Sequence, residues 1–209
     1  MNIKSALRAP AAAALVFSGL ALTGCATMAF TAPIHSQAEQ LPAGDKLPLR
    51  VGLLISEQTL GFQTHAHIPM GEWVYPFGKD LPEVARQTLS QVFDSVTLVQ
   101  SPDFQSYDLI VEPTFDEAAT HVDISMSSIH VVVAMNFTAS NASGVKWRKS
   151  VVGELTTPGS NESFQTHGQA VSKAVSAAAV AMRAELASAR PRADAPSSAA
   201  APAAAWWAK

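Results

Sequence analysis

The stretch Ile129-His130-Val131-Val132-Val133-Ala134-Met135-Asn136-Phe137 decides the fold of this chain. β-Branched residues dominate it, and an apolar run of this length and composition is typical of a β-strand. A second run, 145–156, follows after Asn141-Ala142-Ser143-Gly144, which is typical of a tight turn. The sequence therefore predicts a long antiparallel hairpin formed by strands 124–140 and 145–156.

Two amphipathic helices are predicted, one on each side of this hairpin in the sequence. Between 81 and 94, apolar residues recur every three or four positions, and Asp80 and Glu83 are placed to cap the helix start. Over 163–187, apolar residues fall on one side of a helix, and alanines at other positions raise the helix propensity. One apolar face on each helix predicts that both pack against the sheet.

Shorter strands are predicted before the hairpin. They cover 49–55, 62–68, 96–99 and 107–111, and an aromatic loop at 73–77 follows the second of them. Helices grouped against strands that are mostly neighbours in sequence predict an α+β fold. We therefore expect a single domain over 49–187, with a mainly antiparallel sheet, a long hairpin and two packed helices.

The first residues of the chain predict export. Lys4 and Arg8 precede an apolar run from 11 to 22. This run is shorter than the about 20 apolar residues needed to span a bilayer, and it is typical of a signal peptide over 1–24. The run leads directly to Cys25, the one cysteine of the chain, so neither an intramolecular disulfide nor a cysteine metal cluster is possible.

Leu22-Thr23-Gly24-Cys25 resembles the lipobox of bacterial lipoproteins. The resemblance implies cleavage before Cys25, diacylglycerol on its thiol and acylation of the new amine. The absence of aspartate after the cysteine, where Ala26 stands, implies the outer membrane, with the protein facing the periplasm.

The two ends of the mature chain are predicted to lie outside the folded domain. Residues 25–48 contain three prolines and no sustained period, which predicts a flexible tether for the lipidated cysteine. The segment 188–209 is rich in alanine and proline and is predicted to be disordered. For Trp206 and Trp207, near its end, two interpretations stay open: an interfacial membrane anchor, or an unstructured end.

Charge and composition exclude several classes of function. The mature chain has 12 basic and 17 acidic residues, a formal net charge of -5. Such a chain does not bind nucleic acid or anionic lipid through its overall charge. Phosphate-binding glycine loops and the common hydrolase motifs do not occur in the sequence, and we expect no cofactor and no enzymatic activity.

Two groups of ionisable residues carry alternatives. His65 and His67 would share one face of a strand and could meet a metal ion, with Glu72, Asp116, Glu117 or His121 completing the site. The favoured interpretation is an exposed polar strand face. Asp116, Glu117 and His121 could equally serve an envelope hydrolase, although carboxylates near a strand end usually form a solvated rim.

Two further surface features carry docking alternatives. Trp73, Tyr75 and Phe77 form either a lid over the core or a binding hot spot for a partner protein. The basic residues Lys146, Arg148 and Lys149 surround Trp147, a pattern expected from inside/outside alternation along a strand. The same cluster could dock an acidic partner.

The layout of the mature chain resembles that of small Gram-negative envelope lipoproteins. The resemblance combines the lipobox, a helix ending in Leu89-Ser90-Gln91-Val92-Phe93, the strand Tyr107-Asp108-Leu109-Ile110-Val111, the hairpin and the final helix. YajG-type lipoproteins, auxiliary lipoproteins of envelope ABC transporters and outer-membrane assembly lipoproteins belong to this group. The resemblance implies a non-enzymatic accessory or scaffold role in envelope transport or assembly, with an envelope protein as partner. A carrier of lipid or a small ligand, with a cavity between sheet and helices, stays open as an alternative.

Overall fold

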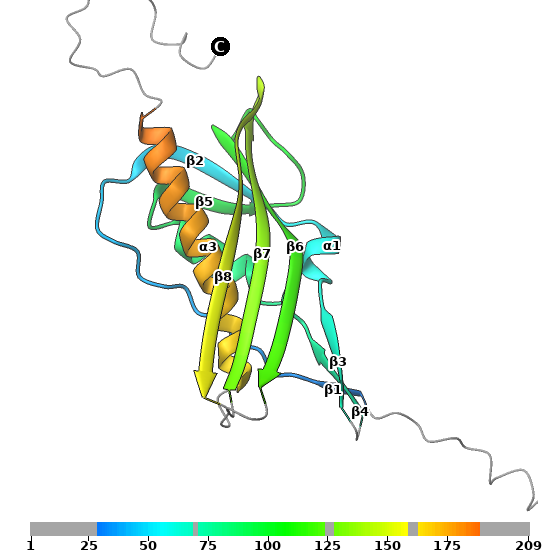
Figure 1. The fold of residues 1–209 in the computed structure, drawn as a ribbon. Helices are drawn as coiled ribbons and strands as arrows, with labels where there is room; N and C mark the ends of the chain where they lie inside the picture. Colours follow the sequence, from blue (N-terminus) through cyan, green and yellow to red (C-terminus); the bar gives the residue numbers. More distant parts are fainter. Residues whose placement is uncertain (1–28, 69–70, 124–127, 159–162, 189–209) are drawn as a thin grey trace, which may run out of the picture.

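The computed structural model describes residues 29–68, 71–123, 128–158 and 163–188. The strands of this part are β1 (Ala29–Thr31), β2 (Leu47–Leu54), β3 (Thr64–Ile68), β4 (Gly71–Tyr75), β5 (Phe93–Val99), β6 (Leu109–Asp123), β7 (Ser128–Asn141) and β8 (Gly144–Pro158). The helices are α1 (Glu57–Leu60), α2 (Leu81–Leu89) and α3 (Ser163–Ser188). The α+β class is confirmed, and Figure 1 shows α3 lying along one face of the large sheet.

The strands form two mixed sheets. A five-stranded sheet has the order β5-β2-β6-β7-β8, and a three-stranded sheet has the order β1-β4-β3. The β6–β7 and β7–β8 pairs are antiparallel, as predicted, whereas β2 is parallel to both β5 and β6. Between β2 and β5 the chain crosses back to the end of the sheet at which β2 begins, and α2 lies on that connection. The two strands therefore run in the same direction.

The predicted hairpin is confirmed in β7 and β8. Its turn ends at Gly144, whose φ of 110° favours glycine, and the Asn141 side chain accepts a hydrogen bond of 2.9 Å from the Ser143 amide. Alternate residues of β7 from Val131 to Ala139 are fully buried beneath α3. The period of two therefore matches the face that the helix covers.

Three predicted boundaries are wrong. β6 continues past Pro113 to Asp123, because β2 pairs with β6 only over residues 109–111 and leaves one side of the strand free where proline is tolerated. α2 ends at Leu89 instead of 94, since Phe93 already begins β5. The expected loop at 73–77 is mostly strand β4, which pairs with β3.

The interface between α3 and the sheet is filled. Gly153 of β8 lies so close to the helix that a Cβ atom there would stand 1.8 Å from the carbonyl oxygen of Ala170. On the helix side, the fully buried residues are Ala170, Val171, Ala174, Val175, Ala178, Ala179 and Met182. Small residues thus allow helix and strand to approach to backbone contact, which leaves no space for a ligand at this point.

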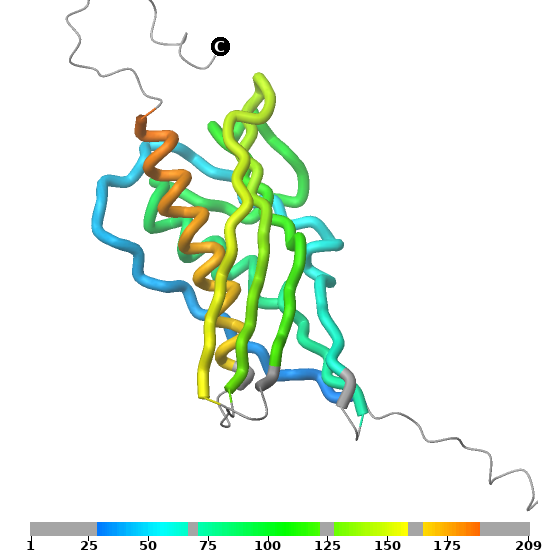
Figure 2. The backbone as a smooth tube through the Cα atoms, viewed as in Figure 1, coloured from blue at the N-terminus to red at the C-terminus, as the bar shows by residue number. Residues whose placement is uncertain are grey.

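The tether predicted over 25–48 is wrong for residues 29–48, which pack on the domain (Figure 2). β1 pairs in parallel with β4, and Ala32, Ile34 and Leu41 are buried in the core. Burial of these apolar side chains supplies a driving force that the expected random coil would lack. Residues 25–28 and the tail 189–209 lie outside the described residues.

Two contacts hold this N-terminal segment against the helices. A Cβ atom at Gly168 of α3 would stand 2.0 Å from the carbonyl oxygen of His35, so the two backbones touch there. The Ser36 amide donates a hydrogen bond of 3.1 Å to the Asp80 carboxylate. Asp80 therefore holds the N-terminal segment, and its side chain does not make the helix-capping bond that the sequence predicts.

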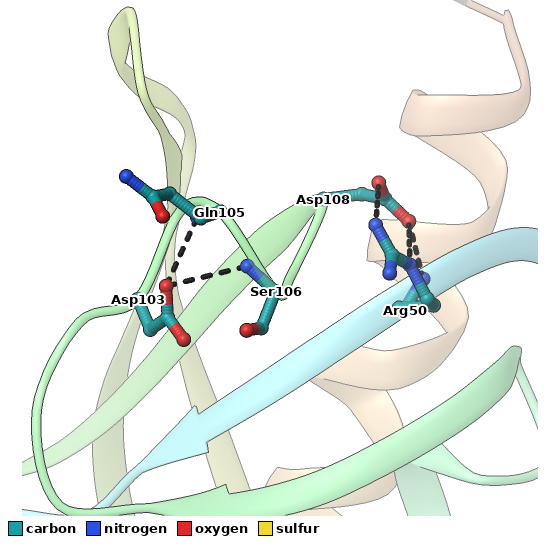
Figure 3. A network of polar contacts seen from close by, with 5 residues as sticks. All are labelled: Arg50, Asp103, Gln105, Ser106 and Asp108. Carbon is teal, nitrogen blue, oxygen red and sulfur yellow. Dashed lines mark hydrogen bonds and ion pairs between the residues drawn. The ribbon is translucent and has the colours of Figure 1, made fainter.

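The connection between β5 and β6 is fixed to β2 by a polar network, drawn in Figure 3. Asp108 accepts a backbone bond of 2.8 Å and a side-chain bond of 3.2 Å from Arg50. Asp103 accepts bonds from the amides of Gln105 and Ser106 and so closes a local turn. These bonds hold the β5–β6 connection against β2, the strand with which the first residues of β6 pair.

Candidate docking surfaces

Two of the three aromatic docking candidates are buried. The ring of Tyr75 stacks on His167 of α3, with centroids 4.4 Å apart, and burial raises the pKa of its phenol. Phe77 is fully buried, and its ring lies 5.7 Å from that of His167. Tyr75 and Phe77 therefore cover the core of their own domain. Trp73 is half-buried, and it packs against Phe30 of β1 at 5.5 Å.

The pairing of β3 with β4 places Glu72, one of the acids predicted to complete a metal site, beside His65. The Nδ1 atom of His65 lies 3.1 Å from a carboxylate oxygen of Glu72, and both residues lie in the small sheet. The side chain of His67 lies outside the described part. Among the described side chains, no three of His, Cys, Asp and Glu converge as a metal site would require.

The proposed hydrolase residues are spread along β6. Asp116 and Glu117 stand at an irregularity of the strand, and His121 follows four residues after Glu117. A strand rises about 3.3 Å per residue, which separates His121 from Glu117 by roughly 13 Å and from Asp116 by more. All three side chains are exposed, so the geometry does not assemble them into a shared cleft.

The basic cluster on β8 is divided between the two faces of the strand. Trp147 is buried and donates a hydrogen bond of 2.8 Å to Glu185 of α3, and Lys149 donates another of 2.8 Å to the same carboxylate. Arg148 is exposed on the opposite face. The predicted inside/outside alternation is thereby confirmed, and the cluster joins the hairpin to the end of α3.

This junction predicts a dependence of stability on pH. Hydrogen bonds from Lys149 and from Trp147 hold the pKa of Glu185 below its usual range. A lowered folded-state pKa contributes stability above the ordinary pKa, and this contribution is lost as the pH falls through the lowered value. We expect Glu185→Gln to melt at a lower temperature than the native protein at pH 7 and to converge with it as the pH falls through the lowered pKa of Glu185.

Thermal melts at several pH values test this expectation, with Glu117→Gln as a control at an exposed site on β6. A constant difference in melting temperature between native and Glu185→Gln protein across the acidic range would contradict the role of the ionised carboxylate.

An open groove runs between α3, the edge strand β8 and the segment 39–42. It has a volume of about 560 Å³. The apolar side chains lining it include Val152 and Val180, which are 57% and 37% exposed, and Lys149 and Lys173 also line it. β8 is the last strand of its sheet, so within the described chain one of its backbone edges has no partner strand. An apolar surface beside an unpaired strand edge is a recurrent docking site for extended peptides.

This groove was not predicted, although two residues of the sequence are signals for it. Val152 breaks the polar pattern of the outward face of β8, and Val180 lies off the buried stripe of α3. Each is an apolar residue on a face that alternation or helical period assigns to solvent. The third wall of the groove, 39–42, lies in the segment that was expected to be a tether.

The position of Cys25 is known only from the sequence, because it lies outside the described residues. The first described residue is Ala29, which begins β1. None of the described helices is long and apolar enough to serve as a membrane span.

No protein-family model matches the chain, and no curated protein matches it. Among solved structures, the chain is similar to protein XCC0632 from Xanthomonas campestris, described by the family model DUF330. That similarity has a TM-score of 0.53 at 9% identity and covers 78% of this chain and all of the other. A minor lipoprotein from Acinetobacter baumannii has a TM-score of 0.38 at 9% identity, with 69% of this chain and 94% of that chain covered. The first similarity supports a shared fold, and the second is too low to carry an argument.

Proposed function

We propose that the protein is a lipid-anchored accessory protein of the bacterial envelope, without enzymatic activity, that docks a partner protein through the groove beside β8. The observation that carries the proposal is a lipobox cysteine just ahead of a domain whose sheet–helix interface is filled. A protein of this kind acts through its surface and its location. The residue after the cysteine, Ala26, favours the outer membrane and an orientation toward the periplasm.

The packing of α3 on the sheet favours docking over transport of a bound ligand. A carrier needs a cavity between sheet and helix of several hundred Å³. The contact of Gly153 with the backbone of α3, and the buried methyl groups around it, occupy that position. Ligand uptake there would require α3 to separate from β8.

The chemistry of the groove favours an extended, mainly apolar segment of a partner. Such a segment can pair its backbone with the free edge of β8 and place alternate side chains on Val152 and Val180. Lys173, whose ammonium group donates to the carbonyl oxygen of Glu154 at 3.2 Å, adds positive charge beside the groove. A carboxylate in the segment would complement this charge.

We expect Val152→Asp to abolish partner capture while leaving the domain folded, because the new carboxylate would be desolvated under an apolar partner. The measurement is a crosslinked pull-down of the tagged, full-length protein from its own envelope, read by mass spectrometry. Val145→Asp is a matched control, since Val145 is also on β8 and is 55% exposed, but it lies beside the hairpin turn.

The outcomes separate the parts of the proposal. Capture retained by Val145→Asp and lost by Val152→Asp supports docking at the groove. Equal capture by both variants would exclude the groove as the docking surface. A partner set that is unchanged in Cys25→Ala would show that the anchor is not required, which would contradict the proposed function as a whole.

A further inference from the structure

We propose that the small sheet rests on the membrane surface, where the aromatic pair Phe30 and Trp73 contacts the interfacial region of the bilayer that holds the lipid of Cys25. This inference rests on the proposed lipidation of Cys25. It replaces the distant, tethered domain expected from the sequence with a domain seated directly on the bilayer.

Only a short length of chain separates the proposed lipid anchor from the fold. Cys25 precedes Ala29, the first residue of β1, by four positions. An extended chain advances at most about 3.6 Å per residue, so these positions span no more than roughly 14 Å. β1 must therefore lie within that distance of the lipidated residue, whatever conformation the intervening residues adopt.

The small sheet carries aromatic side chains close to the proposed anchor. Phe30 and Trp73 are register partners in the parallel β1–β4 pair, and Ala66 stands opposite Trp73 on β3. This gives an apolar row across all three strands, in which Ala66 and Trp73 are partly buried against the core and Phe30 is exposed. Phe30 is 39% exposed even though its ring lies beside that of Trp73. Aromatic side chains that are partly exposed close to a lipid anchor match the residues enriched at membrane–water interfaces.

The rest of the domain extends away from the small sheet. In Figures 1 and 2, β1 and β4 lie at one end of the domain, and the β7–β8 turn and the C-terminal end of α3 lie at the other. α3 has 26 residues, and a helix of that length extends about 39 Å. Lys146 and Arg148 follow directly after the distant turn. The expected membrane contact is therefore aromatic and should not depend on anionic lipid.

Quenching of tryptophan fluorescence by brominated lipids tests the contact in the full-length lipidated protein. The chain has four tryptophans. Replacing Trp147, Trp206 and Trp207 by phenylalanine leaves Trp73 alone, whereas replacing Trp73, Trp206 and Trp207 leaves Trp147 as a matched control near the far end. Each protein is reconstituted into vesicles of zwitterionic phosphatidylcholine with brominated acyl chains, beside vesicles of the same lipid without bromine.

We expect bromine to reduce Trp73 emission by about twofold and to leave Trp147 emission unchanged, as for one interfacial and one distant indole. Adding Phe30→Ser to the Trp73 protein should weaken the quenching, because a polar residue next to Trp73 loosens the contact. If Trp147→Phe weakens folding, the native chain and its Trp73→Phe variant give the same comparison by difference.

The possible failures are distinguishable. Unquenched Trp73 in vesicle-bound protein would overturn the proposed membrane contact, but it would not contradict the lipid anchor. Equal quenching of Trp73 and Trp147 would overturn the proposed orientation. An intact mass without added acyl chains would remove the lipid anchor, and with it both this inference and the proposed function.

Discussion

Gly153→Ala is expected to destabilise the domain by about 3 kcal/mol or more, the upper range of overpacking effects. The added Cβ atom would stand 1.8 Å from the carbonyl oxygen of Ala170 and 2.7 Å from the amide nitrogen of Ala174. Both are backbone atoms, so no side chain can rotate to make room. The helix must move away from β8, and the buried contacts on both sides of Gly153 would be lost with that movement.

Urea unfolding followed by circular dichroism measures this loss. Gly61→Ala is the control, because a Cβ atom there would lie 3.3 Å from the Glu57 carbonyl oxygen at the end of the short helix α1. We expect this control to change the free energy of unfolding by less than about 1 kcal/mol, as for most surface changes. If Gly153→Ala were as stable as Gly61→Ala, the close packing of α3 on β8 would be wrong. A ligand cavity between α3 and the sheet, as the carrier hypothesis requires, would then be possible again.

Phe77→Ala is expected to cost about 3–5 kcal/mol, the usual range for removing a fully buried phenylalanine. The Phe77 side chain packs beside His167 and Phe115, and its removal leaves a cavity where β4, α3 and β6 meet. A loss of that size lowers the melting temperature by roughly 10 °C in a domain of this size. A docking hot spot would behave differently, since it would lose the partner without losing stability.

Trp73→Ala provides the comparison for Phe77→Ala. Trp73 stands in the middle of β4 and is half-buried, whereas Phe77 is fully buried, so we expect a smaller fall in melting temperature than for Phe77→Ala. Scanning calorimetry of the two variants measures both changes. An unchanged melting temperature in Phe77→Ala would contradict its place in the core and return it to the docking candidates.

The hairpin could be predicted because its information is local. The alternation in β7, the turn at 141–144 and the apolar positions of β8 occupy one continuous stretch of sequence. β1 was missed because its strand is three residues long and Pro33 soon follows it. The pattern Phe30, Ala32 and Ile34 is apolar at alternate positions, but its partner β4 lies far along the chain.

The parallel pairing of β2 and the walls of the groove depend on contacts that no sequence window contains. β2 is a short apolar run that would read the same in a parallel or an antiparallel pair. The groove needs α3, β8 and the segment 39–42 to meet, and only tertiary packing brings these three together. The resemblance to a lipobox rests on four consecutive residues, 22–25, and a single stretch of sequence contains it, whereas a docking surface is a property of the whole fold.

The contacts between the two ends of the domain restrict when folding can be completed in a chain that emerges N-terminus first. Arg183 donates a hydrogen bond of 3.0 Å to the carbonyl oxygen of Pro42, 141 residues earlier, and Gly168 supports the backbone at His35. A chain that crosses the membrane from its N-terminus cannot make these contacts until nearly all of the domain has emerged. If the chain is exported and lipidated as proposed, the segment next to Cys25 would stay accessible until the rest of the domain has emerged. The distance along the chain between the contacting residues would then place lipid attachment before the completion of folding.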